Sequence, residues 1–277
     1  TDNNTNHNTN QNNTNKNINF IYQTDENGNN IIHLSAQYKK YDIMLAFSDL
    51  YPELLTKTNN ENKIVLYYLY DQNNPQYMLI MVQNMINYMN KLSDKKNIFE
   101  TIANDGSTIL LTLLTDNIPL YHESIELIIK SGYNMNIPLY NSPLLYYIFF
   151  YEDKINTQKT FDLLIEKSDV NTKNQFCYNA LLMSISNYDP FIVIEKLIKA
   201  GCDINYAGPY NDFLPINHAI ISQWNELINL LIKNNVNINQ IDSSMNTPLH
   251  HLLYQKNYIF SDEILQYFFK NGDFSIK

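Results

Sequence analysis

The sequence predicts an all-α protein, a solenoid built from stacked helix-turn-helix units. Three observations predict this fold. A phrase that begins a helix, such as "NTPLHHLL" at 246–253, recurs along the chain, and so does a phrase that ends one, such as "KLIKAGCDIN" at 196–205. Both phrases return at a spacing of about 34 residues. Units of this length that stack on their neighbours form solenoids, and three or more are needed to bury a stable core.

The chain divides into an N-terminal tract and a repeat array. Residues 1–17, "TDNNTNHNTNQNNTNKN", contain no apolar residue, so we expect them to be disordered. Two glycosylation sequons there, at Asn3 and Asn12, are expected to occur by chance in an Asn/Thr-rich tract. Residues 18–277 form the array. We expect about seven repeats, near 24–58, 59–102, 103–136, 137–173, 174–208, 209–241 and 242–277, with the least certain boundaries in the longer second repeat.

Each repeat begins its first helix at one recurring position. That position is occupied by Asn30, Ile64, Thr108, Ser142, Asn179, Leu214 and Thr247. Asn, Ser and Thr are favoured at the N-cap because their side chains accept hydrogen bonds from the first free N–H groups. Pro248 suits the first helical turn because it has no N–H that needs a partner. Leu249 follows and is expected to point into the stack.

Each repeat also ends its second helix in a recurring way. Lys130, Lys199, Lys233 and Lys270 fall in the last helical turn, where a cation complements the helix dipole. Gly132, Gly201 and Gly272 then favour a left-handed cap, and Asn235 can substitute for glycine there. A hydrophobic residue followed by Asn comes next, at 135–136, 170–171, 204–205 and 238–239.

The spacing and these motifs resemble the ankyrin repeat family. The most specific matches are Thr247-Pro248-Leu249-His250, Ser142-Pro143-Leu144, Pro215 with Ala219, and Asp25–Gly28 followed by His33. The resemblance covers residues from about 24 to 277. It implies two antiparallel helices per repeat and a projecting β-turn finger that joins each repeat to the next. It also implies that partners contact the finger tips and the concave side of the first helices.

The adjacent histidines His250 and His251 suggest a metal or proton-transfer site, but a structural role is favoured. The position of His250 is occupied in other repeats by Tyr67, Leu111, Leu145, Leu182 and Asn217, which cannot share one catalytic site. In the family this histidine bonds near its own helix start and reaches the neighbouring loop. His251 is expected to be a surface or inter-repeat residue. We therefore predict no catalytic residue, no metal ligand and no cofactor, and the sequence contains no P-loop, dinucleotide or nucleophile-elbow motif.

Composition narrows the class of partner. The net charge is -9 and all 19 basic residues are lysines, which argues against nucleic-acid binding. No run of 18 apolar residues exists, so we expect no membrane insertion. The two cysteines, Cys177 and Cys202, form no metal or disulfide motif and favour a reducing compartment. We expect an intracellular protein, cytoplasmic or nuclear.

A cluster of aromatic residues marks the predicted binding surface. Under the family's geometry, Phe176, Tyr178, Tyr210, Phe213 and Tyr254 lie in adjacent fingers and in the groove behind them. Exposed aromatic side chains are good interface anchors. With 22 tyrosines in the chain, aromatic residues also fall at such positions by chance, or pack against the next repeat.

The leading hypothesis is a non-catalytic scaffold or adaptor that binds another protein through finger tips and groove. Two alternatives stay open. In the first, the array is the recognition arm of a larger enzyme, such as a ubiquitin ligase or kinase, whose catalytic part lies outside this chain. In the second, the array is a structural spacer. A first residue that is Thr, and a last helix "DEILQYFFK" with an apolar outer side, lead us to expect a piece of a longer protein. Partner identity and oligomeric state stay open.

Overall fold

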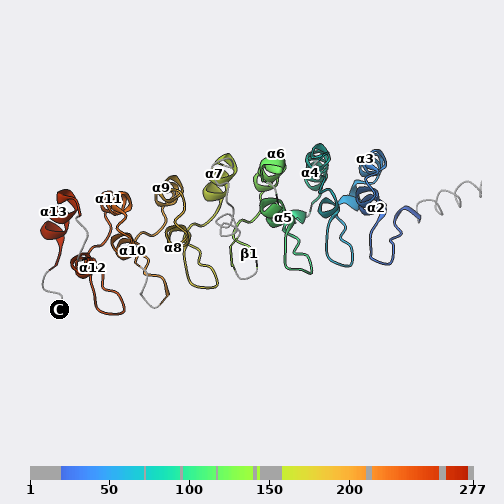
Figure 1. Cartoon of the computed structure of the whole chain (residues 1–277). Helices are drawn as coiled ribbons and strands as arrows, with labels where there is room; N and C mark the ends of the chain where they lie inside the picture. Colours follow the sequence, from blue (N-terminus) through green and yellow to red (C-terminus); the bar gives the residue numbers. More distant parts are fainter. Residues whose placement is uncertain are drawn as a thin grey trace, which may run out of the picture. The chain divides into compact units, whose positions relative to one another are not determined.

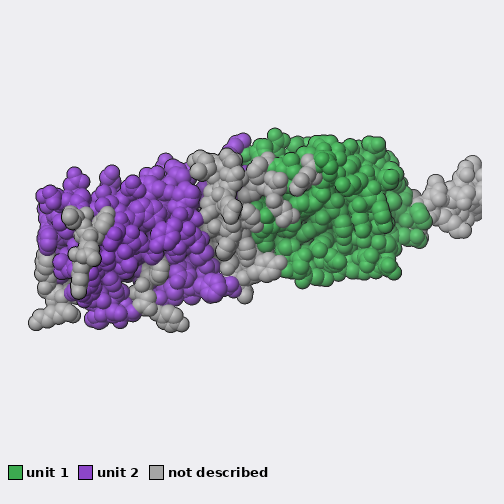
Figure 2. Space-filling view, viewed as in Figure 1, with its two compact units in different colours: residues 1–134 green, residues 135–277 purple. Residues whose placement is uncertain are grey.

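The computed structural model describes residues 20–71, 73–93, 96–116, 118–139, 142–143, 158–209, 214–255 and 260–273. The predicted tract 1–17 lies outside them. The chain divides into two compact units, one ending at Asn134 and the other beginning at Met135 (Figure 2). Within each unit, helix pairs stack side by side above a row of projecting loops, which we call fingers (Figure 1). This arrangement confirms the predicted all-α repeat fold.

The first unit contains three repeats, each with an inner helix next to the finger and an outer helix behind it (Figure 1). The pairs are α2 (Ile31–Gln37) with α3 (Tyr41–Leu50), η2 (Val65–Tyr68) with α4 (Gln76–Met89), and α5 (Ile109–Asp116) with α6 (Ile118–Lys130). Two short 3-10 helices, η1 (Pro52–Thr56) and η3 (Ile98–Glu100), connect the repeats. Apolar residues of the inner helices, such as Ala36 and Leu114, are fully buried between repeats.

The second repeat departs from the others where the sequence is longer. Its inner helix is only a 3-10 turn, preceded by Ile64, which has no side-chain acceptor for a cap. The chain then turns at Asp71, whose carboxylate accepts the N–H of Asn73 at 3.1 Å and the amide of Asn74 at 3.1 Å. The extra residues form the 14-residue helix α4 and the connection to η3.

The second unit contains the remaining helices. They are α7 (Gln158–Lys167), α8 (Ala180–Ser186), α9 (Phe191–Lys199), α10 (Pro215–Ile221), α11 (Asn225–Lys233), α12 (Pro248–Tyr254) and α13 (Asp262–Asn271). The inner helix α10 packs against both α8 and α12, while α7, α9, α11 and α13 form the outer row (Figure 1). Two short antiparallel strands, β1 (Pro138–Leu139) and β2 (Ser142–Pro143), pair Pro138 with Pro143.

The predicted helix starts at Asn30, Thr108 and Asn179 use the expected chemistry, whereas Ser142 lies in strand β2. The Asn30 side chain accepts from the N–H of Ile32 and His33, and Asn179 accepts from Leu182. Thr108 Oγ1 accepts from the N–H of Leu111 at 3.3 Å. The amide groups of Asn30 and Asn179 also donate to carbonyls of Leu54 and Asp203, so each cap fastens its inner helix to a later part of the chain.

The helix ends agree with the expected caps except at the last repeat. Gly132, Gly201 and Asn235 have φ values of 92°, 88° and 61°, all left-handed. The prediction of a left-handed Gly272 is wrong, because this residue is extended, with φ of -72°. Helix α13 runs one residue past Lys270, so the Gly272 N–H still bonds to the Phe268 carbonyl and the chain leaves the helix extended.

The recurring hydrophobic-Asn pairs have a shared role in the second unit. Each asparagine oxygen accepts a backbone N–H from the following repeat. The bonds join Asp169 to Asn136, Asp203 to Asn171, Asn237 to Asn205 and Asp273 to Asn239, at 2.7 to 3.0 Å. This series, the asparagine ladder, links successive repeats edge to edge.

Candidate partner-binding surface

Five described fingers share one backbone frame. In each, the first residue donates its N–H to the carbonyl of the fifth residue, and the fourth residue donates to the carbonyl of the first. The first residues are Asp25, Asn59, Ala103, Asn174 and Asp242. The fourth residues, Gly28, Asn62, Gly106, Cys177 and Met245, all have positive φ. Each finger is therefore a hairpin closed by a residue in the left-handed conformation, which glycine and asparagine adopt most readily.

A side chain at the first position stiffens four of these fingers. The side-chain oxygen of Asp25, Asn59, Asn174 or Asp242 accepts N–H groups from the third and fifth residues, at 2.7 to 3.0 Å. In these four fingers the N–H groups of the first, third, fourth and fifth residues therefore all have hydrogen-bond partners. A finger held this way presents its tip side chains without a large ordering cost on binding.

The tips of the two units differ in chemistry. In the first unit they carry Glu26, Glu61 and Asp105, and neighbouring fingers are joined by the Asn60 N–H to Asn27 O bond and the Asn104 N–H to Glu61 O bond. Lys63 pairs with Glu61 at 2.8 Å and with Asp105 at 3.4 Å.

Two fingers of the second unit each carry one exposed apolar side chain. Phe176 is 63% exposed and Met245 is 56% exposed. Cys177 and Met245 hold their left-handed backbone at φ of 60° and 62° without being glycine or asparagine. Such a conformation costs about 1 to 2 kcal/mol, so these two fingers store strain beside an exposed apolar side chain.

The structure separates the five predicted partner-binding residues. Phe176 lies at a finger tip, and Tyr254, at the end of α12, is 61% exposed. Tyr178 is half-buried, and its carbonyl closes the finger frame. Tyr210 and Phe213 lie outside the described residues. A shared aromatic groove therefore stays a prediction.

His250 and His33 each bind a backbone group. His250 Nδ1 lies 3.1 Å from the Thr247 N–H and 2.9 Å from Thr247 Oγ1, which makes a reciprocal cap at the start of α12. His33 Nε2 bonds the Lys63 carbonyl of the next finger at 3.2 Å, and burial lowers its pKa. Leu249 is half-buried rather than buried, so it contributes less to the stack than Pro248 and Leu252.

The expectation for His251 needs correction. His251 is neither a bare surface residue nor a link between repeats. Its Nε2 lies 2.6 Å from Asp242 Oδ2, the carboxylate that also holds the finger frame of its own repeat. Desolvation acts to raise the pKa of Asp242, but the hydrogen bonds from His251, Asn246 and Ser244 outweigh it and lower that pKa. The sequence signal was an acid at the first finger position with a histidine nine residues later.

No group of three or more His, Cys, Asp or Glu side chains that could hold a metal occurs among the described residues. Cys177 is exposed, whereas Cys202 is buried and its thiol donates to the Val170 carbonyl at 3.3 Å. Burial raises the pKa of Cys202 to about 12, which makes it inert as a thiolate.

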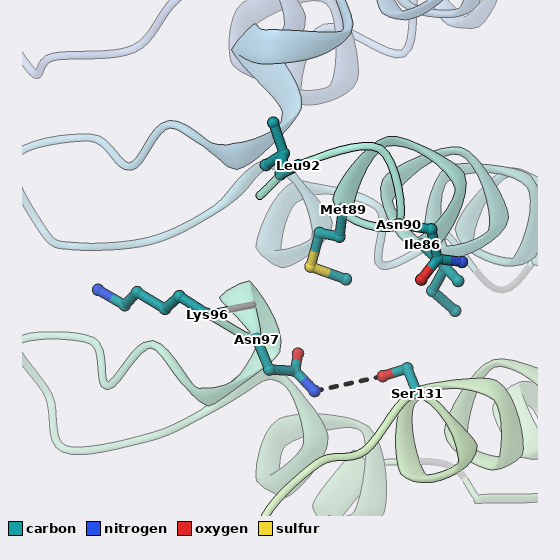
Figure 3. A pocket seen from close by; sticks show the side chains of 7 residues that line it. All are labelled: Ile86, Met89, Asn90, Leu92, Lys96, Asn97 and Ser131. Atoms are coloured by element: carbon teal, nitrogen blue, oxygen red, sulfur yellow. Dashed lines mark hydrogen bonds between the residues drawn. The ribbon is translucent and has the colours of Figure 1, made fainter. Parts of the chain in front are cut away.

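A cavity in the first unit lies away from the fingers, at the ends of α4 and α6. It measures about 320 Å³ and is lined by Ile86, Met89, Asn90, Leu92, Lys96, Asn97 and Ser131 (Figure 3). Asn97 Nδ2 donates to Ser131 Oγ at 3.3 Å along one side (Figure 3). Its lining combines one lysine with amide, hydroxyl and apolar groups and contains no acid, histidine or cysteine.

Comparison with known proteins bears on the fold. No protein-family model and no curated protein sequence matches the chain. Among solved structures, the ankyrin repeat domain of Bcl-3, a member of the IkappaB protein family, aligns with a TM-score of 0.61 at 15% identity, over 82% of this chain and 95% of that one. The human ASB11 ankyrin repeat domain aligns with a TM-score of 0.52 at 11% identity, over 83% of this chain and 100% of that one. No helix in the described part of the chain has the length and apolar character needed to cross a membrane.

Proposed function

Since the chain has the ankyrin-repeat fold, we propose that it is a non-catalytic scaffold or adaptor that binds a protein partner through its fingers and inner helices. The fold alone does not determine function, so the proposal rests on the finger geometry. Two unpaired cysteines support an intracellular, reducing setting, cytoplasmic or nuclear.

The observation that carries the proposal is the exposed apolar tip on a rigid, strained finger. Phe176 presents most of its ring to solvent, although the finger beneath it is fixed by the Asn174 side chain through the N–H groups of Phe176 and Tyr178. An exposed aromatic ring on a fixed backbone loses little conformational entropy on binding and can fill a partner's pocket. A purely structural spacer has no use for it.

The proposed surface extends from the tips to the inner helices. Tyr254 belongs to it as an exposed ring at the end of α12, and Tyr178, Tyr210 and Phe213 are proposed members. The acidic tips of the first unit, at Glu26, Glu61 and Asp105, favour basic groups on any partner that contacts this unit.

A matched pair of variants tests the proposal. Phe176→Ala/Tyr254→Ala removes two exposed rings from the proposed surface. Leu50→Ala/Phe269→Ala removes two apolar side chains of similar exposure, 70% and 56%, from the outer helices α3 and α13. Affinity capture from source-cell lysate should recover a specific protein with wild type and the second variant, but not with the first. Equal recovery by both variants, or no specific protein with wild type, would contradict the proposal and favour a spacer.

A further inference from the structure

The outer side of the second unit carries an apolar groove that faces away from the fingers. It lies between α9 and α11, neighbours in the outer row (Figure 1), and measures about 470 Å³. Its lining residues are Ile192, Glu195, Lys196, Ile198, Lys199, Leu230 and Asn234. Ile198 is buried in its floor and Leu230 is half-buried, so the floor is aliphatic.

The second residue of an outer helix is an acid in α3, α11 and α13, but not in α4, α6, α7 or α9. The second residue of α11 is Glu226, that of α13 is Glu263 and that of α3 is Asp42. An acid there is stabilised by the helix dipole, and it keeps the outer surface polar. In α9 an isoleucine takes this place and is 44% exposed. The exchange removes a favourable charge and adds exposed apolar surface, which stability of the array does not require.

Two opposite charges flank the aliphatic floor without pairing. Glu195 and Lys199 are four residues apart on α9, a spacing that favours an ion pair within a helix. The same spacing in α6 forms one, since Lys130 Nζ lies 2.8 Å from Glu126. In the described part of the chain neither Glu195 nor Lys199 has an ion pair, and Lys196 is paired with Asp162. The groove therefore presents one free acid and one free base.

An aromatic cluster adjoins the Ile192 end of the groove. The Trp224 ring lies 6.2 Å from Phe191 and 6.3 Å from Tyr188, the latter nearly parallel to it. Tyr188 is 66% exposed and has a left-handed backbone with φ of 53°. Trp224 is the only tryptophan of the chain, so its fluorescence reports on this end of the groove.

We propose that the α9–α11 groove binds an amphipathic helix of a partner protein. Apolar side chains of that helix lie on Ile192 and Leu230, while a base faces Glu195 and an acid faces Lys199. Charge complementarity favours this occupant, because one acid and one base flanking an aliphatic floor match the i, i+4 charges that border the apolar stripe of such a helix. A nucleic acid or an anionic membrane would instead require a surface of one sign. This site is separate from the finger surface and does not depend on it.

Peptide binding to the full chain, followed by Trp224 fluorescence, tests the proposal. One probe is a designed amphipathic helical peptide with Glu and Lys four residues apart beside its apolar stripe; the second has Glu at both positions. Wild type should bind the mixed probe at least about tenfold more tightly than the Glu/Glu probe. In Glu195→Lys that preference should reverse, because both partner groups then face lysine.

A second pair of variants tests the apolar floor. Ile192→Glu installs the residue type that α11 and α13 carry at this position, so the helix should fold, and it should weaken the mixed probe by about tenfold or more. Ile43→Glu changes an isoleucine of similar exposure, 46%, on α3 and should leave binding unchanged.

Three outcomes would overturn the proposal. They are no binding of the mixed probe, a probe preference that ignores Glu195, and equal loss of binding in both isoleucine variants. A doubled mass in light scattering that only Ile192→Glu abolishes would instead identify a second copy of this chain as the occupant. Failure here leaves the capture experiment on Phe176 and Tyr254 unaffected, so the two proposals fail separately.

Discussion

At the scale of single residues, the position three residues after the N-cap explains how inner helices bind the next finger. His33 Nε2 bonds the carbonyl of Lys63, and Tyr67 OH bonds that of Ser107, each the fifth residue of the following finger. Asn217 occupies the same position in α10. It is buried, and neither atom of its amide has a hydrogen-bond partner. The shorter side chain leaves a polar group desolvated without compensation.

Asn217→Leu is therefore expected to stabilise the protein by about 1 kcal/mol, since an unpaired buried amide costs roughly 1 to 3 kcal/mol. Leu111 and Leu182 show that leucine is accommodated at this position, where they are almost fully buried. The midpoint of urea unfolding measures the change. His33→Leu, which breaks an existing bond, should lower the midpoint. A lower midpoint for Asn217→Leu would show that the amide is satisfied in solution.

A second residue-scale prediction concerns Gly28. Its φ is 77°, and a Cβ there would lie 2.4 Å from Asn60 Oδ1 and 2.8 Å from the Asn60 backbone nitrogen. Gly132 also has positive φ, at 92°, but a Cβ there meets nothing within 4 Å. Gly28→Ala should cost roughly 2 kcal/mol or more of unfolding free energy, against about 1 kcal/mol for Gly132→Ala. Thermal unfolding of both variants checks the difference, and equal losses would refute the close approach of the two fingers.

At the scale of elements, repeats are joined by the asparagine ladder as well as by their cores. Asn171 accepts the Asp203 N–H at 2.7 Å and donates its amide to the Gly201 carbonyl at 3.0 Å. The Asn205 side chain only accepts, from the Asn237 N–H, and among the residues that the structure describes its amide makes no bond that corresponds to the one from Asn171 to Gly201. The ladder thus contributes unequally along the unit.

Asn171→Ala should lower the free energy of unfolding by about 1 to 2 kcal/mol, and Asn205→Ala by about 1 kcal/mol, since each net hydrogen bond contributes about that much. Amide hydrogen exchange gives the local readout. The Asp203 N–H should exchange faster in Asn171→Ala than in wild type, and its exchange rate should be unchanged in Asn205→Ala. Unchanged protection in both variants would mean that core packing alone aligns the repeats.

The finger that precedes α12, residues 242–246, should lose stability at low pH. The pKa of Asp242 is lowered below its ordinary value of 3.8 by the bonds from His251, Asn246 and Ser244. A lowered carboxylate pKa adds stability that is present above pH 3.8 and is lost as pH falls through the folded-state value. Asp242→Asn should destabilise the protein at pH 7, and the difference from wild type should shrink below pH 3.8. Urea unfolding across pH checks this, and a gap that persists at low pH would contradict the linkage.

Local chemistry made many elements predictable, whereas contacts between elements were not. The caps at Asn30, Thr108 and Asn179 follow from a side chain and an N–H two or three residues away. The end of α13 differs because helix length is set by packing as well as by Gly272. His251 and Asp242 meet because a hairpin and a helix start are folded together, which periodicity does not encode.

At the scale of the whole molecule, each unit is a row of repeats, and in the second unit we propose two binding surfaces. One is the row of fingers and inner helices, where Phe176 and Tyr254 are exposed. The other is the outer row, where the groove beside Ile192 lies. The groove escaped prediction because it forms between helices 34 residues apart in sequence, although an isoleucine at the position where α3, α11 and α13 carry an acid was a visible signal.

We propose that the Phe176 finger contacts a protein partner, and site-specific photo-crosslinking can detect that contact. A photoreactive phenylalanine analogue is placed at Phe176, and at Phe269 as a control of similar exposure on α13. After irradiation in source-cell lysate, we expect one discrete protein adduct from position 176 and none of that mass from position 269. No adduct at position 176, or the same adducts from both positions, would contradict the claim.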